Sequence, residues 1–137
     1  MTGEFAIAVH AIVYLERHEG WHNSEALARN VCTNPARIRK VMSKLKRAAL
    51  IEAKEGVVGG YRFCLEPRAV TLLRVYEAVE TPVVNNCWRS GDPDMDCMVA
   101  SGMAEVMDGI YREMEERCRG KLQEITIQDV VNKLLDR

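Results

Sequence analysis

One segment limits the possible fold of this chain more than any other: an amphipathic helix that follows a tight turn. At 100° per residue, residues 35–49 place apolar side chains on one face, at Ile38, Val41, Met42, Leu45 and Ala49. The opposite face carries basic side chains and the small residues Ala36 and Ser43. A helix of this kind packs on a core with one face and can approach a polyanion closely with the other.

The charges of the chain are distributed unevenly. Its 137 residues have a formal net charge of only −1, which by itself argues against a nucleic-acid-binding protein. Between Arg29 and Lys54, however, eight basic residues accompany one acidic residue, whereas nine basic residues accompany thirteen acidic ones from Pro67 onward. This asymmetry predicts a basic face for nucleic acid joined to a module of a different kind.

The residues before the basic helix predict two further helices. Apolar residues at helical spacing predict a first helix over 4–18, and Ser24 is the expected N-cap of a short second helix. A turn at 32–34 follows, in which Asn34 can cap the third helix and Pro35 suits its first position. Two helices, a turn and a basic helix predict a helix-turn-helix, whose second helix enters the major groove of DNA.

A hairpin is expected after the basic helix. Strand-like runs at 50–54 and 61–65 are separated by a segment with three glycines, which permit positive φ angles. This hairpin would be the wing of a winged helix, resting on the DNA backbone or in the minor groove. The expected DNA-binding residues are Ser24, Thr33, Asn34, Arg37, Arg39, Lys40, Ser43, Lys44, Arg47, Gly59, Gly60, Tyr61 and Arg62.

The second half of the chain predicts helices on either side of an irregular segment. A helix is expected from Pro67, an aperiodic segment over 81–97, a long helix over 98–120 that Gly120 can end, and a last helix capped by Thr126. The long helix has an apolar stripe, and the expected dimerisation residues are Met103, Val106, Met107, Ile110, Tyr111 and Met114. The expected units are a DNA-binding domain over 1–80, a sensor loop over 81–97 and dimerisation helices over 98–137.

Several short motifs of the chain resemble one bacterial family. They are Asn34-Pro35, Leu45-Lys46, Leu50-Ile51, Gly59-Gly60-Tyr61 and the segment Thr71-Leu72-Leu73 with Val75-Tyr76 and Ala78-Val79-Glu80. Together they resemble the Rrf-type winged-helix regulators that include IscR, NsrR and CymR, and the start of the chain is most similar to the YwnA-type branch. The resemblance covers nearly the whole sequence.

The resemblance implies a homodimeric transcription factor, usually a repressor, whose long C-terminal helix pairs with that of a second subunit. A twofold dimer predicts a palindromic operator in double-stranded DNA. The expected fold is mainly α, with a small β-hairpin wing: a winged helix-turn-helix followed by a long dimerisation helix. No nucleophile with its base, phosphate-binding loop or metalloprotease motif is present in the sequence, so we do not expect an enzyme.

The cysteines leave the sensed signal open. Cluster-binding members of the family carry three closely spaced cysteines in the loop before the long helix, whereas this loop has only Cys87 and Cys97. We therefore expect no cofactor, with a [2Fe–2S] cluster as the alternative if other ligands join the two cysteines. Candidates for such ligands are Glu4, His10, Asp92, Asp94 and Asp96. A calcium loop is excluded because Cys97 and Met103 replace the required Gly and Glu. Zinc stays possible with four ligands, although the chain lacks a close cysteine pair.

A thiol switch is the simpler sensor, and a small ligand bound by the loop over 81–97 is the other signal that we consider. Cys97 is expected at the N-terminus of the long helix, where the helix dipole favours a reactive thiolate, and oxidation could join it to Cys87. Cys32 is a second candidate because it precedes the basic helix. The alternative for Cys87 and Cys97 is an inert small side chain.

The start of the chain and its apolar segments predict a cytoplasmic protein. No signal peptide precedes the first helix, and the apolar run Phe5–Leu15 is too short to span a bilayer.

Two functions compete with DNA binding. The chain could be a winged helix that binds only proteins, or it could be an electron-transfer protein. An affinity for DNA that does not fall as salt rises would indicate the protein-binding module, and a bound iron centre would indicate the electron-transfer protein.

Overall fold

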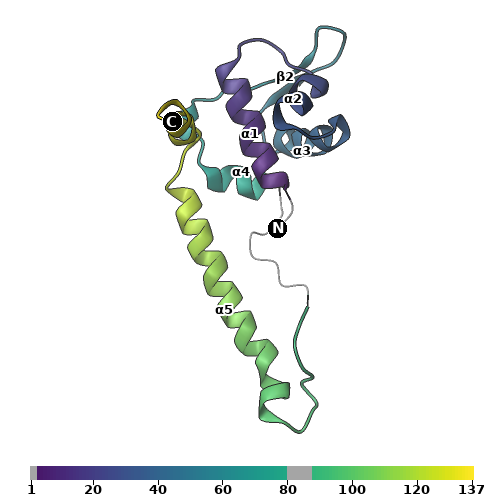
Figure 1. The fold of residues 1–137 in the computed structure, drawn as a ribbon, viewed down its shortest axis with the longest axis vertical. Coiled ribbons are helices and arrows are strands. Elements are labelled where there is room, and N and C mark those ends of the chain that lie inside the picture. Colours follow the sequence, from purple (N-terminus) through teal and green to yellow (C-terminus); the bar gives the residue numbers. More distant parts are fainter. Residues whose placement is uncertain (1–2, 80–87) are drawn as a thin grey trace.

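The computed structural model describes residues 3–79 and 88–137, and its first three helices form where the sequence predicts them. They are α1 (Glu4–Arg17), α2 (Ser24–Val31) and α3 (Pro35–Arg47). The side chain of Asn34 accepts a hydrogen bond from the backbone N–H of Arg37 at 2.8 Å, and so caps α3 as expected. Figure 1 shows the three helices gathered at one end of the molecule.

Two details of this region differ from the prediction. Asn23, rather than Ser24, caps α2, because its side chain accepts from the N–H of Ala26 at 2.9 Å. Ser24 is instead the first helical residue and is buried. Ala49 was expected on the apolar face of the third helix, but α3 ends at Arg47 and Ala49 is an exposed residue with a φ of 60°.

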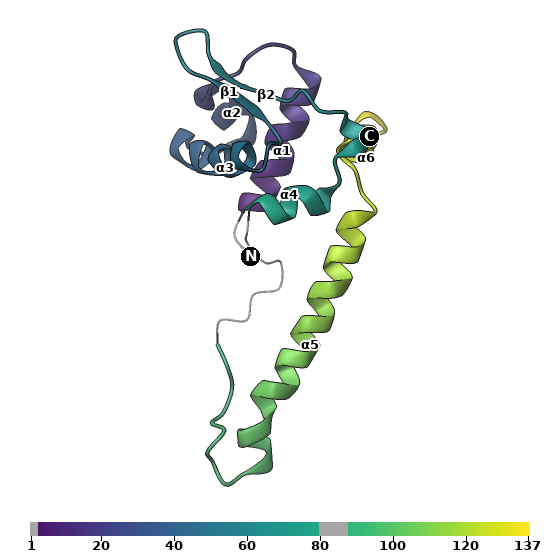
Figure 2. The same cartoon turned by 180° about the vertical axis from the view of Figure 1, so that it is seen from behind.

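The predicted hairpin is present but shorter than expected. Its strands are β1 (Glu52–Lys54) and β2 (Gly60–Arg62), which pair antiparallel with Ala53 opposite Tyr61. The tip between them exposes Val57 completely and Val58 to 75%. The hairpin therefore projects from the helical domain as a wing beside α3 (Figure 2).

The later helices differ from the prediction mainly at their ends. Pro67 begins only a 3₁₀ turn, η1 (Pro67–Ala69), and the α-helix α4 starts afterwards, at Leu72–Val79. The long helix α5 (Met98–Gln123) continues through Gly120, because a single glycine weakens a helix without ending it. The last helix, α6 (Ile127–Leu135), begins with Thr126 as predicted, in a capping box with Asp129.

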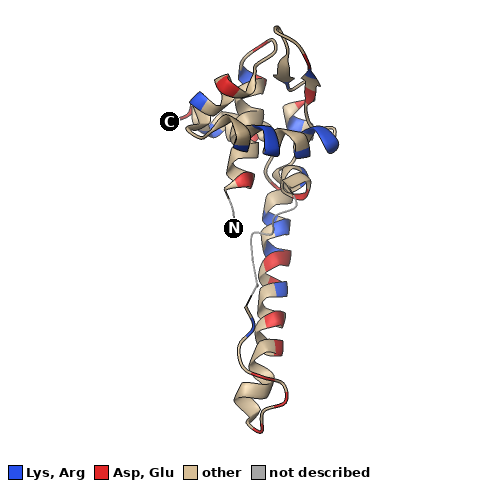
Figure 3. Cartoon of the chain, turned by 90° about the vertical axis from the view of Figure 1, so that its right-hand side faces the viewer, with Lys and Arg blue, Asp and Glu red and all other residues tan. Residues whose placement is uncertain are grey.

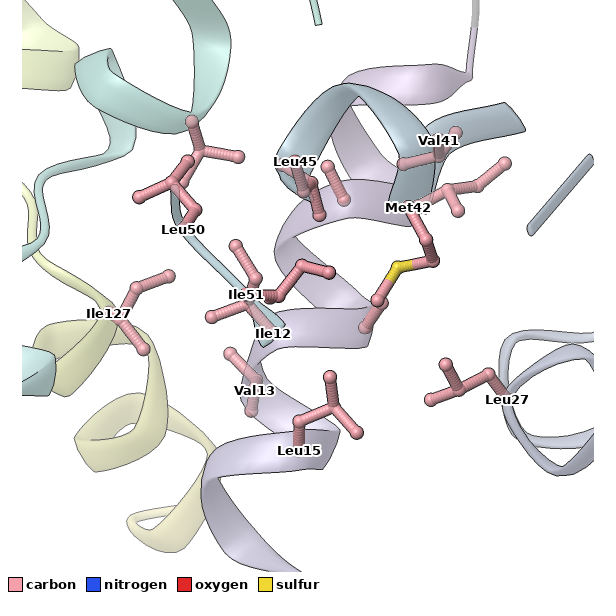
Figure 4. Packing of buried hydrophobic residues seen from close by; sticks show 14 of the residues in the cluster. Ile12, Val13, Leu15, Leu27, Val41, Met42, Leu45, Leu50, Ile51 and Ile127 are labelled. Carbon is pink, nitrogen blue, oxygen red and sulfur yellow. The ribbon is translucent and has the colours of Figure 1, made fainter. Parts of the chain in front are cut away.

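A single apolar cluster joins the N-terminal helices to the end of the chain. Ile12 of α1, Leu45 of α3 and Ile127 of α6 are fully buried in it, as Figure 4 shows. The four residues Ile38, Val41, Met42 and Leu45 form the buried face of α3, as the periodicity of the sequence predicts. This packing fixes the opposite face of α3 toward solvent.

The helix α5 projects away from this core (Figures 1 and 2). None of residues 98–123 is buried, and Val106, Ile110 and Met114 are about half exposed. Near its C-terminal end α5 is tied to α4, since Tyr76 donates a hydrogen bond to Glu115 and Arg119 pairs with Glu77. The chain then returns, and α6 packs against α1, so α6 lies with the N-terminal domain. The division at 1–80, 81–97 and 98–137 stays a prediction.

Among the residues that the model describes, no helix has both the length and the apolar content needed to cross a membrane.

Candidate nucleic-acid interface

The exposed face of α3 carries cations and a small residue side by side. Lys40, Ser43 and Arg47 are exposed on the side of the helix that points away from the buried residues. Lys40 keeps 68% of its side chain exposed although its Nζ lies 3.3 Å from Glu4 Oε1. Figure 3 shows basic residues along α3, whereas acidic and basic residues alternate along α5. The face of α3 is thus suited to a polyanion.

The N-terminus of α3 is held in place by its own side chains. The Asn34 oxygen is engaged in the cap, so its amide N–H₂ is the group left to contact DNA. Thr33 is half-buried in the turn, with its backbone N–H bonded to the Ala28 carbonyl at 3.0 Å. The Arg37 guanidinium lies against Gly3, where an added Cβ would be 2.7 Å from Nη2.

A cleft of about 550 Å³ separates α3 from the wing. Arg39 lies in it and donates a hydrogen bond to Ser24 Oγ at 3.3 Å, so Ser24 acts on Arg39 from a buried position. Residues of α2, α3 and the wing that line the cleft include Ser24, Arg39, Ser43, Lys46, Lys54, Gly59, Gly60 and Tyr61. Six of these eight were among the residues expected to bind DNA, and the fold brings them together.

Sequence reasoning missed the two lysines of this cleft. Lys46 is seven residues after Arg39 and therefore lies on the same side of α3. Lys54 ends β1, opposite Gly60 in the hairpin register. The helical spacing could have identified Lys46, whereas Lys54 required the register of the hairpin.

Lys44, one of the expected DNA-binding residues, is mostly covered and is paired inside the protein. Its Nζ lies 2.9 Å from Glu4 Oε2 and 3.1 Å from the carbonyl oxygen of Val79, and its side chain is only 20% exposed. The Glu4 side chain is 7% exposed. Lys44 therefore joins α3 to the start of α1 and the end of α4, and its role in DNA binding stays a prediction.

The glycines of the wing allow close backbone approach. At Gly59 an added Cβ would lie 2.1 Å from the Lys54 carbonyl oxygen, so a side chain there would prevent the hairpin from closing. Gly60 has a φ of 140°, and a Cβ there would lie 2.4 Å from the carbonyl oxygen of His22. Both positions require glycine for the shape of the wing, which explains the Gly-Gly-Tyr motif.

Tyr61 and Arg62 follow these glycines on β2. Burial raises the pKa of Tyr61, while the positive charge of Arg39 opposes this shift and Glu25 adds to it. Tyr61 therefore keeps its hydroxyl proton and can donate a hydrogen bond to a phosphate. Arg62 donates from Nε to Glu52 Oε2 at 2.8 Å.

Two candidate sensor cysteines lie at helix ends, Cys97 at the start of α5 and Cys32 at the end of α2. Cys97 is the N-cap residue of α5, as the sequence predicts, and it is exposed. The nearby backbone N–H groups of Ala100 and Val99 lower its pKa by stabilising the thiolate. Cys32 is exposed after α2, in a left-handed conformation with a φ of 65°. Cys87 lies outside the described residues.

A capped helix-turn-helix with a basic exposed face and a glycine-closed wing defines a winged-helix DNA-binding protein of the transcriptional regulator class. The Rrf2 family, described as "Iron-dependent Transcriptional regulator", matches residues 1–133, and the chain belongs to this family. Its members are transcriptional regulators rather than enzymes, which confirms the family and the non-enzymatic role predicted from the sequence.

Individual relatives agree with this assignment. The chain is 26% identical to YwnA of Bacillus subtilis (strain 168), assigned to the HTH-type transcriptional regulators, over 98% of both chains. A crystal structure from Lactobacillus plantarum, also assigned as a transcriptional regulator, shares 25% identity and a TM-score of 0.87, covering 98% of this chain and 91% of that one. IscR of T. potens has a TM-score of 0.71 at 17% identity, covering 98% and 87%, and so shares the fold.

The family description raises the question of an iron centre. Among residues 3–79 and 88–137, no three His, Cys, Asp or Glu side chains lie close enough together to hold a metal ion. Two of the candidate ligands have other partners: Glu4 pairs with Lys44 and Lys40, and His10 Nε2 lies 2.7 Å from Asn30 Oδ1. Within the described residues no such group of ligands is assembled, and Cys87, one of the two loop cysteines named for a cluster, lies outside them.

Proposed function

We propose that the protein is a homodimeric regulator that binds palindromic double-stranded DNA through α3 and the wing, and represses transcription by occupying the operator. The observation that carries this proposal is the cleft between α3 and the wing, where Arg39, Lys46 and Lys54 converge. Cations from two elements on either side of one cleft can neutralise phosphates of a DNA strand. The face of Lys40 and Ser43 is then free to reach base edges in the major groove.

The proposed homodimer rests on the exposed apolar stripe of α5. A helix of 26 residues is about 39 Å long, and such a helix is stable in water chiefly when its apolar side is packed. In this chain Val106, Ile110 and Met114 of the stripe are about half exposed, whereas Met107 and Tyr111 lie beside Trp88 and Arg89. A second copy of α5 supplies a matching apolar face, and the resulting twofold symmetry predicts two half-sites in the operator.

A salt titration tests DNA binding directly. Duplex DNA is selected from a random pool by the protein, and its affinity is measured by fluorescence anisotropy between about 50 and 200 mM salt. Release of counterions should lower the affinity by at least tenfold over this range. An affinity that does not depend on salt would contradict the proposal and would favour a winged helix that binds proteins.

The same titration defines the role of Lys40. Lys40→Ala should weaken operator binding by about 1–3 kcal/mol if the ammonium contacts a base edge. Lys121→Ala is the matched control, because Lys121 is 71% exposed on α5, outside the basic face. Equal affinities of the two variants would remove Lys40 from the DNA interface.

We further propose that the signal is an oxidant sensed at Cys97. The exposed thiol and its lowered pKa support this role, since the thiolate is the form that attacks a peroxide to give a sulfenic acid and hydroxide. A disulfide with Cys87, or an adduct at Cys32 beside the turn before α3, are further routes by which oxidation could reach the DNA-binding domain.

The reactivity of Cys97 should reveal its pKa. Because the pKa is lowered, alkylation of Cys97 by iodoacetamide should reach half its maximal rate at a lower pH than alkylation of a cysteine in a short unstructured peptide. Site-resolved mass spectrometry measures these rates. Cys97→Ser should bind DNA normally and lose its response to peroxide, and a persisting response in this variant would reject the switch.

A further inference from the structure

The loop between α1 and α2 reaches the wing and bonds to it. His22 pairs with Tyr61 as an isolated antiparallel bridge, in which each backbone N–H donates to the other residue's carbonyl oxygen at 3.0 and 2.8 Å. The strand β2 therefore has β1 on one side and His22 on the other. Gly60 permits this approach, because a Cβ there would collide with His22. The bridge therefore makes the orientation of the wing relative to the helices depend on the α1–α2 loop.

The same loop supplies an aromatic ring to the base of the wing. The Arg62 guanidinium lies 4.4 Å from the centre of the half-buried Trp21 ring, and Lys54 Nζ lies 5.7 Å from it. These cations come from both strands of the hairpin, and Glu52 holds Arg62 in place. Attraction between cations and an aromatic face adds to the backbone bridge.

The other end of the loop is fixed to α1. The His22 Nε2 donates to the carbonyl oxygens of His18 and Glu19, at 3.1 and 3.0 Å. The rings of His18 and Tyr14 stack with their centres 4.1 Å apart, and the His22 ring meets Tyr14 edge-on at 5.3 Å. Since Tyr14 belongs to α1, the loop is attached to α1 at one end and to the wing at the other, and so fixes the wing relative to the helical core.

From these contacts we infer that Trp21 is a positioning residue for DNA binding, which sets the wing at the angle that its partner DNA requires. Trp21 acts through Arg62 and Lys54 on both strands of the hairpin. The inference rests on the proposed DNA-binding function, but its first consequence concerns the protein without DNA.

Hydrogen exchange of the free, full-length protein tests the first consequence. Trp21→Ala should speed exchange of the Tyr61 amide, which bonds to His22, by about fivefold. Trp21→Phe keeps an aromatic face and should restore most of the protection, whereas Trp21→Leu keeps apolar volume and should not. The matched control is Trp88→Phe, because Trp88 is 79% exposed next to α5. Equal protection in the alanine, leucine and wild-type proteins would overturn the inference.

DNA binding tests the second consequence, with the duplex selected by the wild-type protein. Trp21→Ala should lower affinity about fivefold, and the hydroxyl-radical footprint should fade where the wing contacts the DNA but persist beneath α3. A uniform loss over the whole footprint would mean general destabilisation and would overturn the positioning role. If the wild-type protein shows no salt-dependent DNA binding, the proposed function fails, while the exchange data on free protein still decide the role of Trp21.

Discussion

Ile110→Glu should leave the protein monomeric and lower its affinity for a palindromic operator by at least about 100-fold. A twofold interface contains the substitution twice, and each glutamate would place an unpaired charge in an apolar contact at a cost of several kcal/mol. Folding of the chain should be unaffected, because Ile110 is 46% exposed and lies outside the core cluster. Light scattering after gel filtration gives the mass, and anisotropy gives the affinity.

The control for this prediction lies on the opposite face of the same helix. Arg112 is two residues from Ile110 and therefore about 160° away around α5, and it is exposed. Arg112→Glu introduces the same side chain without touching the apolar stripe and should remain a dimer. A dimeric Ile110→Glu protein would show that the subunits associate through a surface other than the apolar stripe of α5.

Lys44→Ala should lower the free energy of unfolding by about 3 kcal/mol. The substitution removes a cation 2.9 Å from the buried Glu4 carboxylate, and breaking a buried ion pair from one side costs far more than losing a surface pair. It also removes the hydrogen bond to the Val79 carbonyl, so α1, α3 and α4 lose a shared contact. Urea unfolding followed by circular dichroism measures the change.

Two comparisons make this prediction specific to the buried pair. Lys40→Ala should change stability by less than about 1 kcal/mol, because that side chain is mostly exposed. The double variant Glu4→Leu, Lys44→Met should recover much of the lost stability, since apolar residues can replace a buried pair at little cost. If Lys44→Ala keeps full stability yet weakens DNA binding as much as Lys40→Ala, then Lys44 is a DNA ligand after all.

Periodicity and capping were sufficient to predict most of the fold. The buried face of α3, the Asn34 cap, the Thr126 cap and the place of Cys97 at the start of α5 each follow from local rules. The caps depend on residues within one turn of helix, and the buried face of α3 depends on a spacing repeated over about two turns. The glycines between the two strand-like runs likewise predicted a hairpin, because they permit the positive φ angles that a tight turn needs.

The sequence was less informative where contacts join distant residues. Lys44 belongs by local pattern to the basic flank of a recognition helix, and only the packing of α1 shows that Glu4, forty positions earlier, meets it. Ser24 is a good cap by residue type, but Asn23 takes that role one position earlier. Trp21 gave no sequence signal because its role depends on the hairpin register.

The attachment of α5 gives the molecule a mechanical property. Its contacts with α4 at Glu115 and Arg119 hold one end, while the part from Met98 to Met114 overhangs, with Arg89 paired to Asp108 along it. This overhang is about 25 Å long, so a tilt of about 5° at the base moves the tip by about 2 Å. A rotation of α5 at its contacts with α4 would therefore displace Cys97, at the far end, further than any other residue of the helix.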